Sequence, residues 1–91
     1  MYWTKGITEL PVWFSHLNCN IINLSNNEIK SLPNNIGNLK CLNLTLRNNK
    51  IDILPKSIRD LDCEHLDLSD NNITSFDGID YMRCEELVLR G

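Results

Sequence analysis

Apolar residues recur along this chain at fixed distances from four cysteines. The cysteines occupy positions 19, 41, 63 and 84, so consecutive cysteines are 22, 22 and 21 residues apart. An isoleucine or leucine stands three residues after each cysteine and a leucine five residues after it: Ile22 and Leu24, Leu44 and Leu46, Leu66 and Leu68, Leu87 and Leu89. Self-similarity at such a period is the sequence signature of a repeat protein.

Each repeat begins with a segment in which apolar and polar residues alternate, as in LNLTL at residues 42–46. A period of two is typical of a half-buried β-strand. We expect Leu44 and Leu46 to point into a core, with Asn43, Thr45 and Arg47 on the other side. Because so short a strand cannot bury its apolar side alone, we expect the copies to pair about 4.8 Å apart as a parallel sheet.

An asparagine follows three of these strands, at Asn27, Asn49 and Asn71, where the chain must bend away from the sheet. The side-chain amide both donates and accepts hydrogen bonds, so stacked copies can satisfy backbone groups of neighbouring coils. We therefore predict a structural ladder of these three asparagines. In two units an L-P-x-x-I-x-x-L segment follows, and its proline favours the start of a short helical turn.

The motif C-x-x-[LI]-x-L-x-x-N-x-I followed by x-x-L-P-x-x-I-x-x-L resembles the leucine-rich repeat, with cysteine where that family usually has leucine. The resemblance implies an α/β fold, a right-handed solenoid with a curved parallel β-sheet on the concave face and short helical or 3-10 turns on the convex face. We expect one domain over residues 1–91. It would comprise a partial unit 1–18, repeats 19–40, 41–62 and 63–83, and a C-terminal partial unit 84–91.

The four cysteines fall on one inward repeat position and include no C-x-x-C pair. We therefore interpret them as small apolar side chains in a buried ladder: Cys19, Cys41, Cys63 and Cys84. Neighbours in such a row are within disulfide range, so an occasional disulfide is one alternative reading and a metal site is another.

The sequence offers no candidate catalytic residue or cofactor site and, apart from the alternative reading of the cysteines, no metal site. His65, Asp67 and Ser69 are expected on one face, but an open sheet supplies neither an oxyanion hole nor exclusion of water. Two glycine-rich motifs that bind nucleotide phosphates, G-x-x-x-x-G-K-[ST] and G-x-G-x-x-G, do not occur in the sequence. The net charge of -3 and the absence of a basic run argue against nucleic acid and anionic membranes as partners.

The resemblance implies that the concave face binds another protein, and we expect a non-catalytic protein–protein interaction module. The side chains expected there are Asn43, Thr45, Arg47, His65, Asp67, Asp70 and Glu86. Such positions are held rigidly by the core without being part of it. A partner should be polar and basic near the acidic residues. The alternative is a plain solvated face.

The two ends of the chain suggest further contacts. Tyr2, Trp3 and Trp13 are expected to cap the first coil, whereas the apolar edge strand at residues 87–89 is expected to be covered, by self-association or by another protein. The chain could thus be a structural subunit of a larger assembly, or the recognition part of a longer effector or enzyme. No export signal and no membrane-spanning stretch is evident, so we expect an intracellular, cytoplasmic protein.

Overall fold

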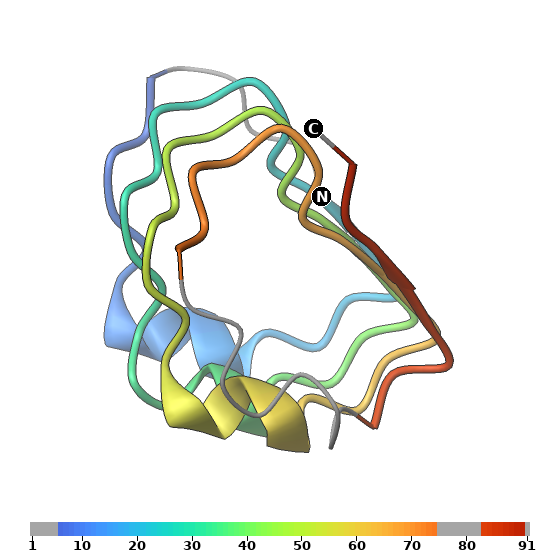
Figure 1. The fold of residues 1–91 in the computed structure, drawn as a ribbon. Coiled ribbons are helices and arrows are strands. Elements are labelled where there is room, and N and C mark those ends of the chain that lie inside the picture. The colour runs from blue at the N-terminus through green and yellow to red at the C-terminus, as the bar shows by residue number, and fades with distance from the viewer. Residues whose placement is uncertain (1–5, 75–82, 91) are drawn as a thin grey trace.

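The alternating segments of the repeats form one parallel sheet in the computed structural model, which describes residues 6–74 and 83–90 (Figure 1). The strands are β1 (Ile21–Asn23), β2 (Asn43–Thr45), β3 (His65–Asp67) and β4 (Glu86–Val88), and they lie in the order β1-β2-β3-β4. The pairing register equals the repeat register, so that Leu44 lies between Ile22 and Leu66. The expected parallel sheet is confirmed.

Backbone hydrogen bonds between coils continue beyond the three-residue strands. Leu24 N donates to Thr45 O at 2.9 Å, and Asn26 N donates to Arg47 O at 3.0 Å. Adjacent coils are therefore bonded along the whole alternating segment, and residues at equal repeat positions become neighbours in space.

Within the described residues, three 3-10 helices occupy another side of the coils, as Figure 1 shows. They are η1 (Val12–His16), η2 (Ile36–Asn38) and η3 (Lys56–Asp60). The first turn of each closes on a proline carbonyl: Phe14 N donates to Pro11 O, Ile36 N to Pro33 O and Ile58 N to Pro55 O, at 3.0–3.1 Å. Proline fixes φ in the range that starts such a turn. The short helical turns expected from the sequence are therefore confirmed as 3-10 helices.

The helices stack closely because η2 carries a glycine. Gly37 N donates to Ser57 Oγ at 3.3 Å, and a Cβ added to Gly37 would lie only 2.2 Å from Ser57 O. No larger residue fits this contact without moving η2 away from η3.

The core runs through the inside of the coils as stacked rows of aliphatic side chains. Twelve large side chains of residues 6–74 and 83–90 are fully buried: Phe14, Ile22, Leu24, Ile29, Ile36, Leu39, Leu44, Leu46, Ile51, Ile58, Leu61 and Leu66. Each row repeats one position of the sequence motif, so one coil buries its apolar side only against its neighbours.

The described ends of the chain are more open than the middle. Trp13, expected in an N-terminal cap, is 52% exposed, and its expected companions Tyr2 and Trp3 lie outside the described residues. In the last coil, Leu87 and Val88 are half-buried and Leu89 is exposed.

Candidate protein-binding face

The outward side chains of β1–β4 form one surface together with Arg47, just after β2, and Asp70, just after β3. We call this surface the strand face. Of the side chains expected there, Arg47, His65, Asp70 and Glu86 are exposed, and Asn43, Thr45 and Asp67 are half-buried. Within it Asn43 lies beside His65, His65 beside Glu86, and Thr45 beside Asp67. The repeat register thus gathers side chains from distant parts of the sequence.

Charged side chains at and beside this face are paired between neighbouring coils. The exposed pairs are His65 Nδ1 with Glu86 Oε1 at 3.3 Å, Arg47 Nε with Asp70 Oδ2 at 3.1 Å, and Lys50 Nζ with Glu28 Oε1 at 3.7 Å. The first is ionic only when the histidine is protonated. Solvent-exposed pairs of this kind contribute about 0–1 kcal/mol, so a partner could replace them at little cost.

The Asp67 side chain forms a hydrogen bond within the turn that follows β3. Its Oδ1 accepts a hydrogen bond from Ser69 N at 2.9 Å, as Asn23 Oδ1 does from Ser25 N at 3.0 Å. Asparagine and aspartate commonly bond the backbone two residues on, and this local role was missed from the sequence. One side of the carboxylate is therefore used to shape the end of β3.

The expectation that Ser69 faces outward with His65 and Asp67 is wrong, since Ser69 is only 1% exposed. Alternation ends with the strand, and the Ser69 hydroxyl turns toward the next coil, where it accepts from Arg90 N at 3.1 Å. Ser69 is thus a structural residue of the turn.

Asp70 combines a backbone role with its ion pair. It has a φ of 58°, and Asn26 and Asn48 at the same repeat position have φ values of 62° and 59°. Asparagine and aspartate tolerate this left-handed conformation better than other non-glycine residues. The recurrence of Asn, Asn and Asp at one repeat position was the sequence signal for this turn.

Asn43 presents an unusual polar atom beneath the strand face. Its Oδ1 is buried and, among the described residues, has no hydrogen-bond donor. A buried acceptor without a donor costs about 1–3 kcal/mol. A donor from a bound molecule that reached this atom would remove that cost.

The three predicted ladder asparagines lie where consecutive coils meet. The Asn27, Asn49 and Asn71 Oδ1 atoms accept from Ile7 N, Ile29 N and Ile51 N of the preceding coil at 3.2, 3.1 and 3.0 Å, respectively. Asn27 and Asn49 are buried and Asn71 is half-buried. Each amide thus satisfies a backbone group that the bend would otherwise leave without a partner.

A comparison of the sequence with protein families agrees with the repeated coils of the structure. The family model of the Leucine Rich Repeat matches residues 18–39, 38–61 and 62–82, three consecutive units that cover most of the chain. The chain belongs to the leucine-rich repeat family. Leucine-rich repeats are generally protein-interaction modules and are typically non-catalytic. Neither the comparison with curated proteins nor that with solved structures found a match.

The cysteines of this leucine-rich repeat chain lie side by side at one repeat position. Cys41 and Cys63 are buried, whereas Cys19 and Cys84, at the ends of the row, are half-buried. Burial, and to a smaller extent the neighbouring thiols, raises the pKa of Cys41 to about 11 and that of Cys63 to about 12. Burial also raises the pKa of Cys84. All four are free thiols.

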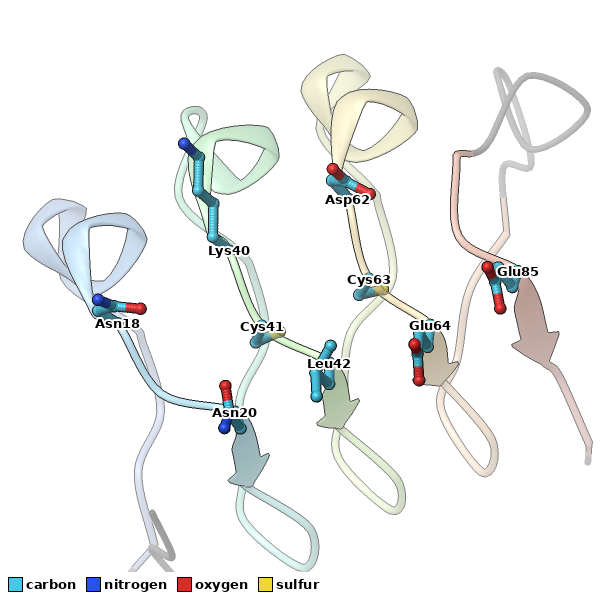
Figure 2. Close-up of a pocket in the computed structure, with 9 residues that line it drawn as sticks. All are labelled: Asn18, Asn20, Lys40, Cys41, Leu42, Asp62, Cys63, Glu64 and Glu85. Carbon is cyan, nitrogen blue, oxygen red and sulfur yellow. The ribbon is translucent and has the colours of Figure 1, made fainter.

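An open hollow of about 390 Å³ lies where the coils enter their strands (Figure 2). It is lined by Asn18, Asn20, Lys40, Cys41, Leu42, Asp62, Cys63, Glu64 and Glu85. The sequence interpretation missed this hollow, because its residues come from adjoining positions of consecutive coils. Reading the repeat as columns, as for the strand face, would have found it.

Residues 6–74 and 83–90 contain no group of three or more histidine, cysteine, aspartate or glutamate side chains that is placed to hold a metal ion. Nor is any helix there long and apolar enough to cross a membrane.

Proposed function

We propose that this leucine-rich repeat chain is a non-catalytic interaction module that binds another protein through the strand face. The observation that carries the proposal is the exposure of Arg47, His65, Asp70 and Glu86 on or directly after strands whose inward residues pack into the core, with Leu44 and Leu66 buried and Leu87 half-buried. Such side chains are held rigidly by the core and are free to contact a partner.

The chemistry of the face favours a polar partner with basic groups. Asp67, Asp70 and Glu86 carry negative charge, and the two basic side chains among them, Arg47 and His65, are already paired with carboxylates. A lysine or arginine of the partner could compete for Asp70 or Glu86. Aromatic side chains, which often anchor interfaces, are absent among the described outward strand residues, so we expect modest affinity.

Two acidic residues allow a matched test of this proposal. Glu86 lies on the strand face, and Asp60 lies in η3 on another side of the coils; both are exposed. We expect the wild-type chain to capture a specific protein from extracts of its own cells, and Glu86→Lys to lose it. Asp60→Lys, with the same change in charge, should retain it. Equal loss with both variants, or loss with Asp60→Lys alone, would contradict the use of the strand face.

The open edge of β4 supports a second proposal, pairing with another copy of the chain. Leu89 is 39% exposed, and among the described residues β4 pairs with β3 alone. Exposed edge strands are templates for further pairing. Sedimentation of the 91-residue chain should show a concentration-dependent dimer that Val88→Lys and Leu89→Lys weaken. A monomer at all concentrations would refute this proposal.

We also propose a single domain over residues 1–91 and an intracellular, cytoplasmic setting. Four free cysteines in so short a chain suit a reducing compartment. Alkylation of thiols at the moment of cell lysis tests the setting, and four alkylated cysteines are expected. Persistent disulfides in freshly lysed cells would argue for an oxidising compartment.

A further inference from the structure

Cys63 and Cys84 are brought together by the last pairing of the sheet. Leu66 lies opposite Leu87, and each cysteine stands three residues before its leucine. Glu85 N donates to Cys63 O at 3.3 Å, so the two backbones are adjacent at the cysteines themselves. Neighbouring parallel strands lie about 4.8 Å apart, within the range of about 4.4–6.8 Å that a disulfide requires between Cα atoms.

We propose that Cys63 and Cys84 form a reversible disulfide by exchange with a small-molecule disulfide such as oxidised glutathione. The bond would join the last coil covalently to the coil before it. Glu86 lies two residues from Cys84 and His65 two residues from Cys63, so the bond would also hold one edge of the strand face in place.

This pair is better placed to react than the other neighbours in the cysteine row. The hydrogen bond from Glu85 N to Cys63 O holds the two backbones together at this pair. Cys84 is half-buried and lies in a coil that, among the described residues, has a strand on one side only. It can therefore shift to close the bond. Cys19, at the other end of the row, is also half-buried in a coil with an edge strand, but its thiol donates to Ile21 O of its own coil at 3.6 Å.

The reagent reaches the pair through the partial exposure of Cys84, which is half-buried. Cys63 lines the hollow together with Glu64 and Glu85, and Figure 2 shows these residues on the last two coils. A small disulfide can therefore react first at Cys84, at this end of the row, without unfolding of the coil.

The exchange balances in two steps. The Cys84 thiolate attacks the small disulfide RSSR, forming a mixed disulfide and releasing RS⁻, which takes up the proton that Cys84 lost. The Cys63 thiolate then attacks the Cys84 sulfur and releases the second RS⁻, which is protonated in turn. Two protein S–H bonds are lost and one S–S bond forms, while RSSR is reduced to two RSH.

Because the thiolate is the nucleophile, the raised pKa values of the cysteines slow the exchange at neutral pH. Burial raises the pKa of both Cys63 and Cys84, so few thiolates form at neutral pH. The hydrogen bond from Cys63 opposes this rise at Cys84, which favours Cys84 as the first nucleophile. We expect the rate to increase by up to about tenfold per pH unit below these pKa values.

Tryptic digestion shows which cysteines are joined by a disulfide, because trypsin cleaves the chain so that every cysteine lies on a different peptide. The peptides span residues 6–30, 41–47, 60–83 and 84–90. The folded 91-residue chain is treated with oxidised glutathione at mildly alkaline pH, alkylated, digested and examined by mass spectrometry. We expect 60–83 linked to 84–90 to exceed each other linkage at least about fivefold.

The denatured chain is the matched control. The three neighbouring cysteine pairs are separated by 22, 22 and 21 residues, so loop-closure entropy barely distinguishes them in an unfolded chain. In concentrated urea we expect the three linkages in similar amounts. The same even distribution from the folded chain, no linked peptide, or dimers alone would overturn the proposal.

Two variants separate the steps of the exchange. Cys63→Ser should stop at the mixed disulfide on Cys84, detected as glutathione on peptide 84–90. The double variant Cys19→Ser/Cys41→Ser should form the Cys63–Cys84 bond at an unchanged rate. Glutathione on another cysteine in Cys63→Ser, or failure of the double variant while its circular dichroism matches the wild type, would contradict the assignment.

Discussion

Asn49 reaches across from its own coil to Leu24 in the preceding one, where its Nδ2 donates to Leu24 O at 3.1 Å. The same nitrogen donates to Leu46 O at 2.9 Å within its own coil, and its Oδ1 accepts from Ile29 N. One side chain thus joins the ends of two strands and satisfies backbone groups on both. Because an asparagine recurs at this repeat position, the same bonds hold successive coils together and keep the strand face in place.

Replacement of Asn49 by alanine should destabilise the fold strongly. It would leave the buried Ile29 N without the Asn49 acceptor, at a cost of about 1–3 kcal/mol. It would also remove the Asn49 bonds to Leu24 O and Leu46 O, although these oxygens keep bonds from Asn27 and Asn71. We expect a decrease in the free energy of unfolding of about 2 kcal/mol or more, measured by urea denaturation. The control Asn20→Ala removes an exposed amide and should cost less than about 0.5 kcal/mol. Equal effects of the two variants would exclude the ladder.

Gly37 sets the spacing of the helical side of the coils. Because an added Cβ would meet Ser57 O at 2.2 Å, Gly37→Ala must push η2 away from η3. We expect a loss of about 2 kcal/mol in the free energy of unfolding, in line with overpacking elsewhere. Asn38→Ala in the same helix is exposed and serves as the control. An alanine at 37 that raises stability, as it would in an unconstrained helix, would contradict the packing.

Asn48 should tolerate glycine but not a β-branched residue. Its φ of 59° is easily adopted by glycine and costs an ordinary L-residue roughly 1–2 kcal/mol. Asn48→Gly should therefore unfold at nearly the same urea concentration as the wild type, although it loses the exposed hydrogen bond to Asn26 Oδ1. Asn48→Val should be destabilised by about 1–2 kcal/mol. Similar stability of both variants would show that the turn does not require this conformation.

The buried thiols should make the fold sensitive to alkaline pH. The pKa of Cys41 is raised from 9.0 to about 11 and that of Cys63 to about 12, chiefly by burial. The folded state therefore holds protons that the unfolded state releases above pH 9, so stability falls as the pH rises from about 9 toward 11 and beyond. The urea midpoint should fall more steeply over this range for the wild type than for Cys41→Ala/Cys63→Ala. Parallel curves would show that the two thiols do not contribute.

Much of the architecture was predictable because the sequence repeats. The period of two around Leu44 fixed the inward row, and the repeat spacing fixed its pairing with Ile22 and Leu66. In a solenoid, residues at equal repeat positions are neighbours, so long-range contacts follow from a local pattern.

The details of the candidate face were less predictable, because they depend on geometry where the pattern ends. The burial of Ser69 and the hydrogen bond from Ser69 N to Asp67 arise after β3, where alternation no longer applies. The Arg47–Asp70 ion pair crosses diagonally between coils, and no single column of the repeat contains both residues. Neither relationship has a signal in hydrophobic periodicity.

The proposed function is tested most directly by adding the captured partner to the isotope-labelled chain and following the amide chemical shifts of that chain. If the strand face binds, the shifts should change most at Asn43–Thr45, His65–Asp67 and Glu86–Val88. The 3-10 helices Val12–His16, Ile36–Asn38 and Lys56–Asp60 should be little affected. Changes concentrated in those helices, with the strand amides unmoved at saturation, would contradict the account.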